Sequence, residues 1–169
     1  MTDKKICQII FSKLKGVENL LDIGCGEGCN CLAQKLQNPV IGLDISNKGF
    51  NKAQALCKRF NSCRLVKCLE GKAENLRRVV GNKKFDVITC LHSCHHMGDL
   101  RRVLKQSKKV LRRRGKFIIA EYSPNRGKKE DNCRRFSIKF IVDLLIKNNF
   151  PNIKIEQPEK GFFLLVASL

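Results

Sequence analysis

A glycine-rich segment followed by an isolated carboxylate is the part of this chain best suited to binding a small molecule. In the run LLDIGCGEG, three glycines stand at alternate positions after Asp22: Gly24, Gly26 and Gly28. Glycines spaced in this way let the backbone turn sharply and let a ligand approach closely. Asp44 ends the next apolar run, where a carboxylate can accept two hydrogen bonds from ribose hydroxyls. The pattern favours a nucleotide-like ligand, and a tight turn without a ligand is the alternative.

This glycine spacing differs from that of two other ligand-binding loops. Cys29 stands where the dinucleotide fingerprint G-x-G-x-x-G needs its third glycine, and the Lys-Ser/Thr pair of a phosphate-binding P-loop does not follow. An NAD-dependent oxidoreductase is therefore disfavoured. Binding of a nicotinamide cofactor would test that alternative.

The three histidines of the chain stand close together: His92, His95 and His96, with Cys90 and Cys94 beside them. A neutral imidazole can take a proton from an oxygen or nitrogen nucleophile near neutral pH. Histidine and cysteine also bind zinc, although here they are compressed into one loop. Three interpretations stay open: side chains that shape a pocket, acid–base catalysis by His95 and His96, or a metal site.

Helical and strand-like hydrophobic periods alternate along the chain and must position these residues. Such alternation predicts a parallel sheet with helices on both faces, and two closely linked strands at the end predict an antiparallel C-terminal strand. The expected fold is α/β, a doubly wound, mostly parallel, seven-stranded Rossmann-like sheet. The predicted strands are 20–23, 40–45, 64–69, 85–91, 116–122, 153–155 and 162–168, and the predicted helices are 4–14, 28–37, 50–60, 74–80, 99–113 and 136–148.

The length and composition predict one globular domain, residues 1–169, with a strong positive charge. A chain of 169 residues with 43% hydrophobic residues can bury its own core, which excludes a disordered tail. Its 34 Lys and Arg against 15 Asp and Glu give a formal net charge of +19. This excess favours a polyanionic partner, although charge that serves only solubility is the alternative.

The cysteines and the N-terminal segment indicate where the protein works. Ten cysteines are too few for a disulfide scaffold, and the absence of any CxxC pair leaves no metal centre predicted. The N-terminus lacks the apolar core of a signal peptide, and the longest apolar run, Phe162–Ala167, is too short to cross a bilayer. We therefore expect a cytoplasmic protein with mostly reduced thiols and no membrane association.

Taken together, the motifs resemble those of the class I S-adenosylmethionine-dependent methyltransferases, particularly the small type 11 group related to ubiquinone-biosynthesis enzymes. LLDIGCGEG is similar to the first motif of that family, VIGLDIS to the second and GKAENL to the third. FDVITCLHSCHHM is similar to the fourth, and VLRRRGKFIIAE to the segment after it. The resemblance covers the chain from about residue 17 onward. It implies a class I methyltransferase fold and S-adenosylmethionine as cofactor, with S-adenosylhomocysteine as product.

The resemblance also implies roles for individual residues of the glycine loop. The backbone around Gly24, Cys25 and Gly26 would face the methionine part of the cofactor. Asp22 would support the loop or the amino group of the cofactor, and Gly28 belongs to the same loop.

The second and third motifs would hold the nucleoside. Asp44 would bind the ribose and Ile45 would pack on the adenine. The Ala73 amide would meet an adenine ring nitrogen. Lys72 stands where the family often has an acid that accepts from the adenine amino group, so either Glu74 takes its place or that contact is missing.

The fourth motif would face the reacting end of the cofactor. A carbonyl of Cys90 or Leu91 would accept from the methionine ammonium, and His95 and His96 are the candidate catalytic pair. Because the sulfonium already activates the methyl group, the protein needs mainly to align donor and acceptor and to exclude water.

Residues 101–135 carry much of the excess positive charge. Much of this charge is expected on the outward face of helix 99–113, where a charge run is usually solvated. Arg126, Lys128 and Lys129 follow a predicted strand, so they should border the mouth of the site. With Tyr122, they are candidate contacts to nucleic acid. Little chain is left to roof the substrate, which favours a large substrate or a lid from a second subunit of a homodimer.

The function best supported by the sequence is methyl transfer to an O, N, S or C acceptor, either a small molecule or RNA. The alternative class is a non-catalytic cofactor-binding or RNA-binding module that kept the fold. The intact glycines and Asp44 disfavour this alternative, whereas Lys72 favours it.

Overall fold

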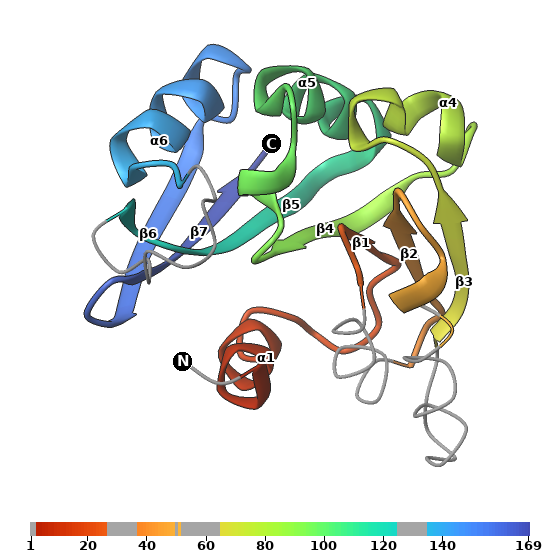
Figure 1. Ribbon diagram of the computed structural model, residues 1–169, viewed down its shortest axis with the longest axis horizontal. Helices are drawn as coiled ribbons and strands as arrows, with labels where there is room; N and C mark the ends of the chain where they lie inside the picture. The colour runs from red at the N-terminus through yellow and green to blue at the C-terminus, as the bar shows by residue number, and fades with distance from the viewer. Residues whose placement is uncertain (1–2, 27–36, 50, 52–64, 125–134) are drawn as a thin grey trace.

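The computed structural model describes residues 3–26, 37–49, 51, 65–124 and 135–169. These residues contain a seven-stranded sheet of order β3-β2-β1-β4-β5-β7-β6 (Figure 1). Neighbouring strands from β3 to β5 are parallel, and β7 is antiparallel to both β5 and β6. The predicted fold class, including the antiparallel C-terminal strand, is confirmed.

The described elements have the following bounds. The strands are β1 (Leu20–Ile23), β2 (Val40–Asp44), β3 (Leu65–Glu70), β4 (Phe85–Leu91), β5 (Leu111–Tyr122), β6 (Asn152–Glu159) and β7 (Phe162–Ser168). The helices are α1 (Asp3–Phe11), α4 (Leu76–Val80), α5 (Leu100–Val110) and α6 (Ile138–Lys147), with the short 3-10 turns η1 (Ala73–Asn75) and η2 (Cys94–His96). None of the described helices has the length and hydropathy of a membrane span.

Helices cover both faces of the sheet, with α4, α5 and α6 on one face and α1 on the other (Figure 1). Strand β5 serves both layers because successive side chains of a strand point to opposite faces. Phe117 and Ile119 join the core under α5 and α6, whereas Ile118 and Ala120 join the core with α1. This two-sided burial explains why residues 117–120 of the strand form an unbroken apolar run.

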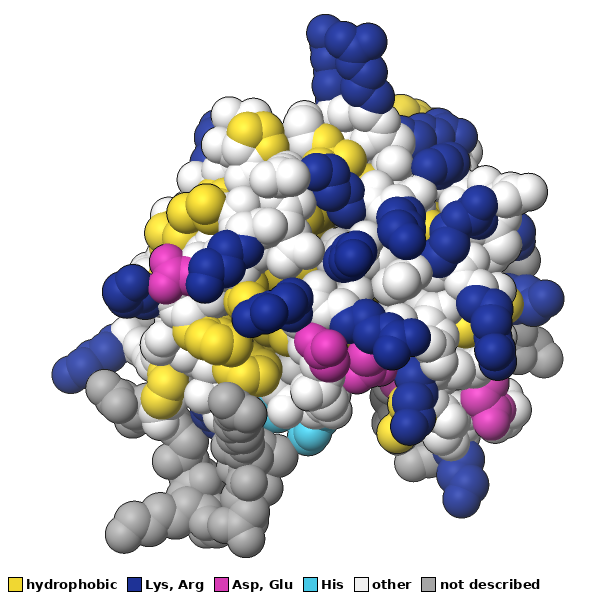
Figure 2. Space-filling view, turned by 90° about the horizontal axis from the view of Figure 1, so that it is seen from above, with side chains coloured by type: hydrophobic (Ala, Val, Ile, Leu, Met, Phe, Trp, Pro, Cys, Tyr) yellow, Lys and Arg dark blue, Asp and Glu magenta, His cyan; other side chains and the backbone are white. Residues whose placement is uncertain are grey.

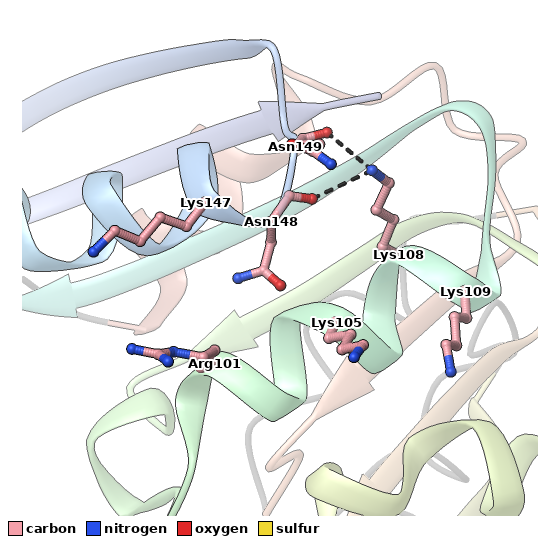
Figure 3. A pocket seen from close by; sticks show the side chains of 7 residues that line it. All are labelled: Arg101, Lys105, Lys108, Lys109, Lys147, Asn148 and Asn149. Carbon is pink, nitrogen blue, oxygen red and sulfur yellow. Dashed lines mark hydrogen bonds between the residues drawn. The ribbon is translucent and has the colours of Figure 1, made fainter.

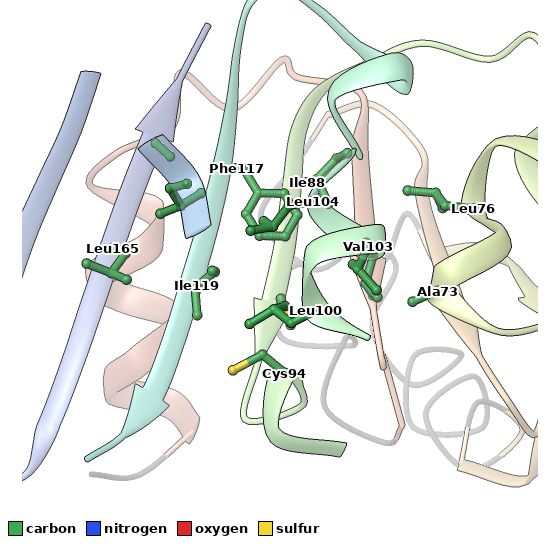
Figure 4. Packing of buried hydrophobic residues seen from close by; sticks show 14 of the residues in the cluster. Ala73, Leu76, Ile88, Cys94, Leu100, Val103, Leu104, Phe117, Ile119 and Leu165 are labelled. Carbon is green, nitrogen blue, oxygen red and sulfur yellow. The ribbon is translucent and has the colours of Figure 1, made fainter. Parts of the chain in front are cut away.

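Helix α5 is fixed to the sheet by side chains at helical spacing. Leu100, Val103 and Leu104 are buried and lie over β4 and β5 with Ile88 and Phe117 (Figure 4). The Asp99 side chain caps this helix by accepting from the Arg102 amide at 2.9 Å. The N-terminus of α5 is therefore held beside the carboxyl end of β4.

The structure shortens the predicted helix 99–113, because α5 ends at Val110 and β5 begins at Leu111. Leu111 has extended backbone, is buried, and pairs with Phe85 of β4. Arg114 has a φ of 65°, and the pairing of β5 with β4 is irregular here, because the register shifts between Phe85 and Val87. Leu111 thus continues the apolar pattern of the helix but packs in the sheet. The predicted helices 28–37 and 50–60 lie almost entirely outside the described residues.

The cysteines that the structure describes are in two states. Cys25, Cys68, Cys90 and Cys94 are free, and Cys7 is disulfide-bonded. In addition, the sulfur atoms of Cys25 and Cys68 lie 3.7 Å apart, in a hydrogen bond and not in a disulfide.

Candidate functional site

A cavity of about 660 Å³ opens at the carboxyl ends of β1, β2, β3 and β4. Strand β1 lies between β2 and β4, so the strand order changes direction here, which is where doubly wound sheets bind ligands. The volume lies in the range of small-molecule sites. The lining residues are Ile23, Gly24, Gly26, Leu43, Asp44, Ile45, Gly71, Lys72, Ala73, Glu74, His92, Ser93, His96, Met97 and Gly98.

The glycine loop after β1 is shaped by a close contact and by an open side. Gly24 and Gly26 have positive φ values of 67° and 42°. A Cβ on Gly24 would lie 2.4 Å from the Cβ of Ser93, so this loop packs directly on the loop after β4. A Cβ on Gly26 would meet no atom of the described residues within 4 Å. The Gly26 backbone is therefore accessible from the cavity.

The Asp44 carboxylate connects the glycine loop to the end of β2. Its Oδ2 accepts from the Gly26 amide at 2.9 Å, and its Oδ1 accepts from the Ser46 amide at 3.3 Å. The Gly71 amide donates to the Asp44 carbonyl at 2.8 Å, which joins the loop after β3 to the same point. A carboxylate held by two backbone amides keeps lone pairs for a ligand in the cavity.

The loops after β2 and β3 form the opposite wall. Ile45 leaves 74% of its surface exposed at this wall, an unusual position for a large apolar side chain. Ala73 is buried beside it, and Lys72 and Glu74 also line the cavity. Oε1 of Glu74 accepts from the Asp99 amide at 3.2 Å, so this acid also contacts the start of α5.

Asp22 lies beneath the glycine loop and outside the cavity lining. It is buried, and its Oδ1 accepts from Oγ1 of Thr89 at 2.6 Å. Burial raises the pKa of Asp22 from its ordinary 3.8 to about 7, against the opposing effect of the Thr89 hydrogen bond and with a smaller contribution from Asp44. Folding therefore favours the protonated acid.

This raised pKa predicts a stability that falls with increasing pH. Between pH 4 and pH 7 the unfolded chain has lost the Asp22 proton while the folded chain keeps it, so the free energy of unfolding declines across that range and levels off above it. In the Asp22→Asn variant, whose side chain stays neutral, the free energy of unfolding should decline by up to roughly 4 kcal/mol less over this pH range. Thermal unfolding at several pH values between 4 and 8 measures the effect. Parallel curves for the two proteins would contradict it.

Three further predicted residues lie next to the cavity but outside its lining. Cys25 is buried, with its sulfur toward Cys68. Cys90 is buried and places its Sγ 3.1 Å from the Oγ of Ser93. Leu91 is half-buried at the end of β4.

The three histidines occupy three different environments. His96 lines the cavity. His95 is almost buried, and its Nδ1 lies 2.6 Å from Oε2 of Glu121. His92 also lines the cavity, has a φ of 49°, and stacks on Tyr122 with ring centroids 4.6 Å apart. The rings of His95 and His96 are 4.0 Å apart.

Glu121 is a buried acid that sequence analysis did not single out. His95 and Cys94 contact its Oε2, the latter at 3.2 Å, and the Tyr122 amide donates to its Oε1 at 2.9 Å. Arg135 lies 3.6 Å from Oε1. Burial alone would raise the pKa of Glu121, but contacts with His92, His95 and the Tyr122 amide hold it well below its usual range. An acid directly after the apolar residues 117–120 was the available signal.

Ser93 is the second residue that the sequence analysis missed. It is buried, donates from Oγ to the Ile23 carbonyl at 2.8 Å, and packs on Gly24. It therefore fixes the loop after β4 to the end of β1. Only its place between the histidines pointed to this role.

The remaining predicted site residues lie outside the part of the chain that the structure describes: Gly28, Arg126, Lys128 and Lys129. Within the described ranges, no group of three or more His, Cys, Asp or Glu side chains could hold a metal ion.

A family model described as a methyltransferase domain matches residues 21–119. The chain belongs to the methyltransferase domain family. The matched segment begins in β1 and ends in β5, so it contains the elements that form the cavity. This membership confirms the resemblance that the motifs indicated.

Relatives and solved structures agree with this assignment. The methyltransferase domain is 31% identical over 151 residues to the demethylmenaquinone methyltransferase of Thermotoga maritima, covering 88% of this chain and 58% of the relative. It resembles the structure of YcgJ from Bacillus subtilis with a TM-score of 0.72 and 20% identity, covering 93% of this chain and 70% of that one. It also resembles the magnesium protoporphyrin IX methyltransferase of Synechocystis, solved with bound S-adenosylmethionine, with a TM-score of 0.72 and 18% identity over 98% of this chain and 77% of that one. The domain spans about half the length of the curated relatives it matches.

Proposed function

We propose that this methyltransferase domain transfers a methyl group from S-adenosylmethionine to an oxygen, nitrogen, sulfur or carbon acceptor. One observation carries the proposal: the Asp44 carboxylate stands at the end of β2 inside the cavity, 2.9 Å from the Gly26 amide of the glycine loop. This pairing of an accessible glycine backbone with a fixed carboxylate fits a nucleoside that carries an amino acid. The cofactor supplies the methyl group, activated by its sulfonium charge.

The cavity residues can be assigned to parts of the cofactor. Asp44 accepts from the ribose hydroxyls, and Ile45 packs on the adenine with the Ala73 amide and Glu74 at its edge. The exposed position of Ile45 fits this role, since adenine would cover it.

The methionine part lies along the glycine loop in this proposal. The backbone of Gly24, Cys25 and Gly26 faces it, Asp22 supports the loop from beneath, and Gly28 belongs to the same loop. A carbonyl of Cys90 or Leu91 accepts from the ammonium group.

The two candidate catalytic histidines take different roles. His96 lines the cavity and is the group that takes a proton from the acceptor. His95 is a positioning residue, because Glu121 holds its Nδ1 and its ring contacts that of His96.

This division predicts unequal effects of substitution. His96→Gln should lower kcat by about 100-fold or more without changing the affinity for S-adenosylmethionine. His95→Gln should have the smaller effect on kcat and should also lower the melting temperature, because it breaks the contact with Glu121. Steady-state kinetics from pH 6 to 9 and calorimetry separate the two. An unchanged kcat for His96→Gln would remove the proposed base.

A direct assay tests the proposed function as a whole. Labelled methyl groups from S-adenosylmethionine are offered together with RNA, protein and small-metabolite fractions of the source organism. Label in one fraction, absent with Asp44→Ala, supports methyl transfer. Failure of the wild-type protein to bind S-adenosylmethionine in calorimetry would overturn the proposal.

Lys72 favours a second candidate, a non-catalytic module that binds the cofactor. Lys72 lines the cavity and stands in the sequence where similar enzymes often have an adenine-binding acid, which weakens the expected contact. In that case S-adenosylmethionine would bind while no fraction acquired label.

We also propose that residues 1–169 act as one domain in the cytoplasm. In a homodimer, the second subunit is the candidate lid over the cavity. The four free thiols among the described cysteines support a reducing compartment, and the disulfide at Cys7 is the exception. Thiol labelling of the unfolded chain, isolated without reductant, should modify most of its ten cysteines. Light scattering determines the oligomeric state.

A further inference from the structure

A second hollow lies on the helical face of the molecule, away from the candidate cofactor site. It has a volume of about 620 Å³ and lies between α5 and the end of α6. In Figure 3, Lys147 and Asn148 at the end of α6 stand across from the side chains of α5. We call this hollow the basic groove; it is lined by Arg101, Lys105, Lys108, Lys109, Lys147, Asn148 and Asn149.

The groove is lined by five cations and no acid. None of these cations forms an ion pair with a carboxylate of the described residues, and Lys108 instead donates to the Asn148 and Asn149 carbonyls at 3.3 Å. Some cations elsewhere among the described residues do pair with carboxylates, such as Lys139 with Asp143 at 3.0 Å. Basic side chains extend well beyond the groove across this face (Figure 2). Grouped cations without counter-charges create a field that attracts polyanions.

Stabilisation of the helix termini does not account for this arrangement. Lysines in the last turn of a helix interact favourably with its dipole, which explains Lys108, Lys109 and Lys147. Arg101, however, lies in the first turn of α5, where a positive charge is unfavourable, and Lys105 lies in the middle. These two cations therefore require another explanation.

Helix α5 connects the groove to the candidate cofactor site. Gly98 lines the cofactor cavity and directly precedes the Asp99 cap of this helix. From that cap, α5 runs for 11 residues, about 16 Å, and carries Arg101 and Lys105 along the way. A chain of phosphates in the groove would thus lead toward the cavity.

We propose that the basic groove binds the sugar–phosphate backbone of a nucleic acid that carries the methyl acceptor. The concave shape favours a strand over a flat layer of lipid headgroups, because its lining cations come from two helices. This inference names the substrate class of the proposed methyltransferase and rests on that proposed function for its catalytic consequence. Binding through phosphates is independent of base sequence.

Charge reversal within the groove provides the test. Fluorescence anisotropy with a labelled single-stranded RNA should show a loss of affinity of about tenfold or more for the Lys105→Glu/Lys109→Glu variant. Its salt slope should be shallower by about 2, because two phosphate contacts are lost. The matched control, Lys154→Glu/Lys160→Glu, makes the same change in net charge at exposed positions in and beside β6 and should lose much less.

Equal losses of RNA affinity in both variants would overturn the proposal, because net charge alone would then explain RNA binding. Tighter binding to anionic phospholipid vesicles than to RNA would also overturn it, and a DNA strand of equal length separates RNA from DNA. S-adenosylmethionine calorimetry on the groove variant should match wild type. If the groove variant loses RNA binding but still binds the cofactor, the result supports the groove. If the wild-type protein does not bind the cofactor, the proposed function is wrong, whatever the groove does.

Discussion

Replacing Asp44 with alanine is expected to weaken the binding of S-adenosylmethionine by at least about 100-fold. Hydrogen bonds to a charged acceptor contribute about 1.5–3 kcal/mol each, and the ribose offers two donors. The same carboxylate holds the Gly26 and Ser46 amides, so its removal also releases the glycine loop. Isothermal titration calorimetry measures the loss directly.

Two variants make this experiment specific. Asp44→Asn keeps the size of the side chain but loses the charge, and should bind with intermediate affinity. Asp143→Asn removes a half-exposed carboxylate on α6 that pairs with Lys139, and should bind as wild type does. A folded Asp44→Ala protein with unchanged affinity would exclude Asp44 from the cofactor site.

The second large effect is expected at Glu121. The Glu121→Ala variant removes the buried carboxylate that contacts a ring nitrogen of His95 and pairs with Arg135, and breaking a buried pair costs about 3–5 kcal/mol. For a domain of this size, the melting temperature should fall by roughly 10 °C. Glu156→Gln is the control, because that acid pairs with Lys13 in a partly exposed position and should change stability by less than about 1 kcal/mol.

The lowered pKa of Glu121 also predicts how the stability of the fold changes at acid pH. Because its pKa is lowered in the folded state, its ionised form stabilises the fold above the ordinary value of 4.5, and this contribution is lost as the pH falls below it. Glu121→Gln should therefore unfold with a weaker pH dependence below pH 4.5 than wild type does. Identical acid unfolding of both proteins would show that the carboxylate charge does not stabilise the fold. This effect lies mostly below the range from pH 4 to pH 7 in which Asp22 acts.

Local hydrophobic patterns were sufficient to predict most of the sheet. Residues 85–91 and 162–168 form strands with the predicted bounds, because β4 and β7 are apolar on both faces. Periodicity alone placed the end of α5 too late. Leu111 fits the apolar stripe of the helix, but its partner Phe85 is a distant residue in a different strand. Such a pairing depends on the packed sheet.

The cofactor site followed from sequence because its parts are short and linked to strand ends. Glycines after one strand and an acid at the end of the next must meet at the carboxyl edge of a parallel sheet, and Asp44 does contact Gly26. The different environments of the histidines could not be predicted in this way. His95 turns toward Glu121 of β5 while its neighbour His96 faces the cavity, which depends on a strand far along the chain.

The sequence by itself determined the family, the sheet and the carboxylate beside the glycine loop, because these depend on local patterns of residues. Only the tertiary structure brought Glu121 beneath the histidines and Lys147 of α6 opposite Arg101 of α5. The positive charge on α5 was expected to be solvated, since a helix considered alone has only solvent outside its apolar stripe. Packing against α6 turns that face into one wall of a groove, because contacts between distant segments decide which charges meet.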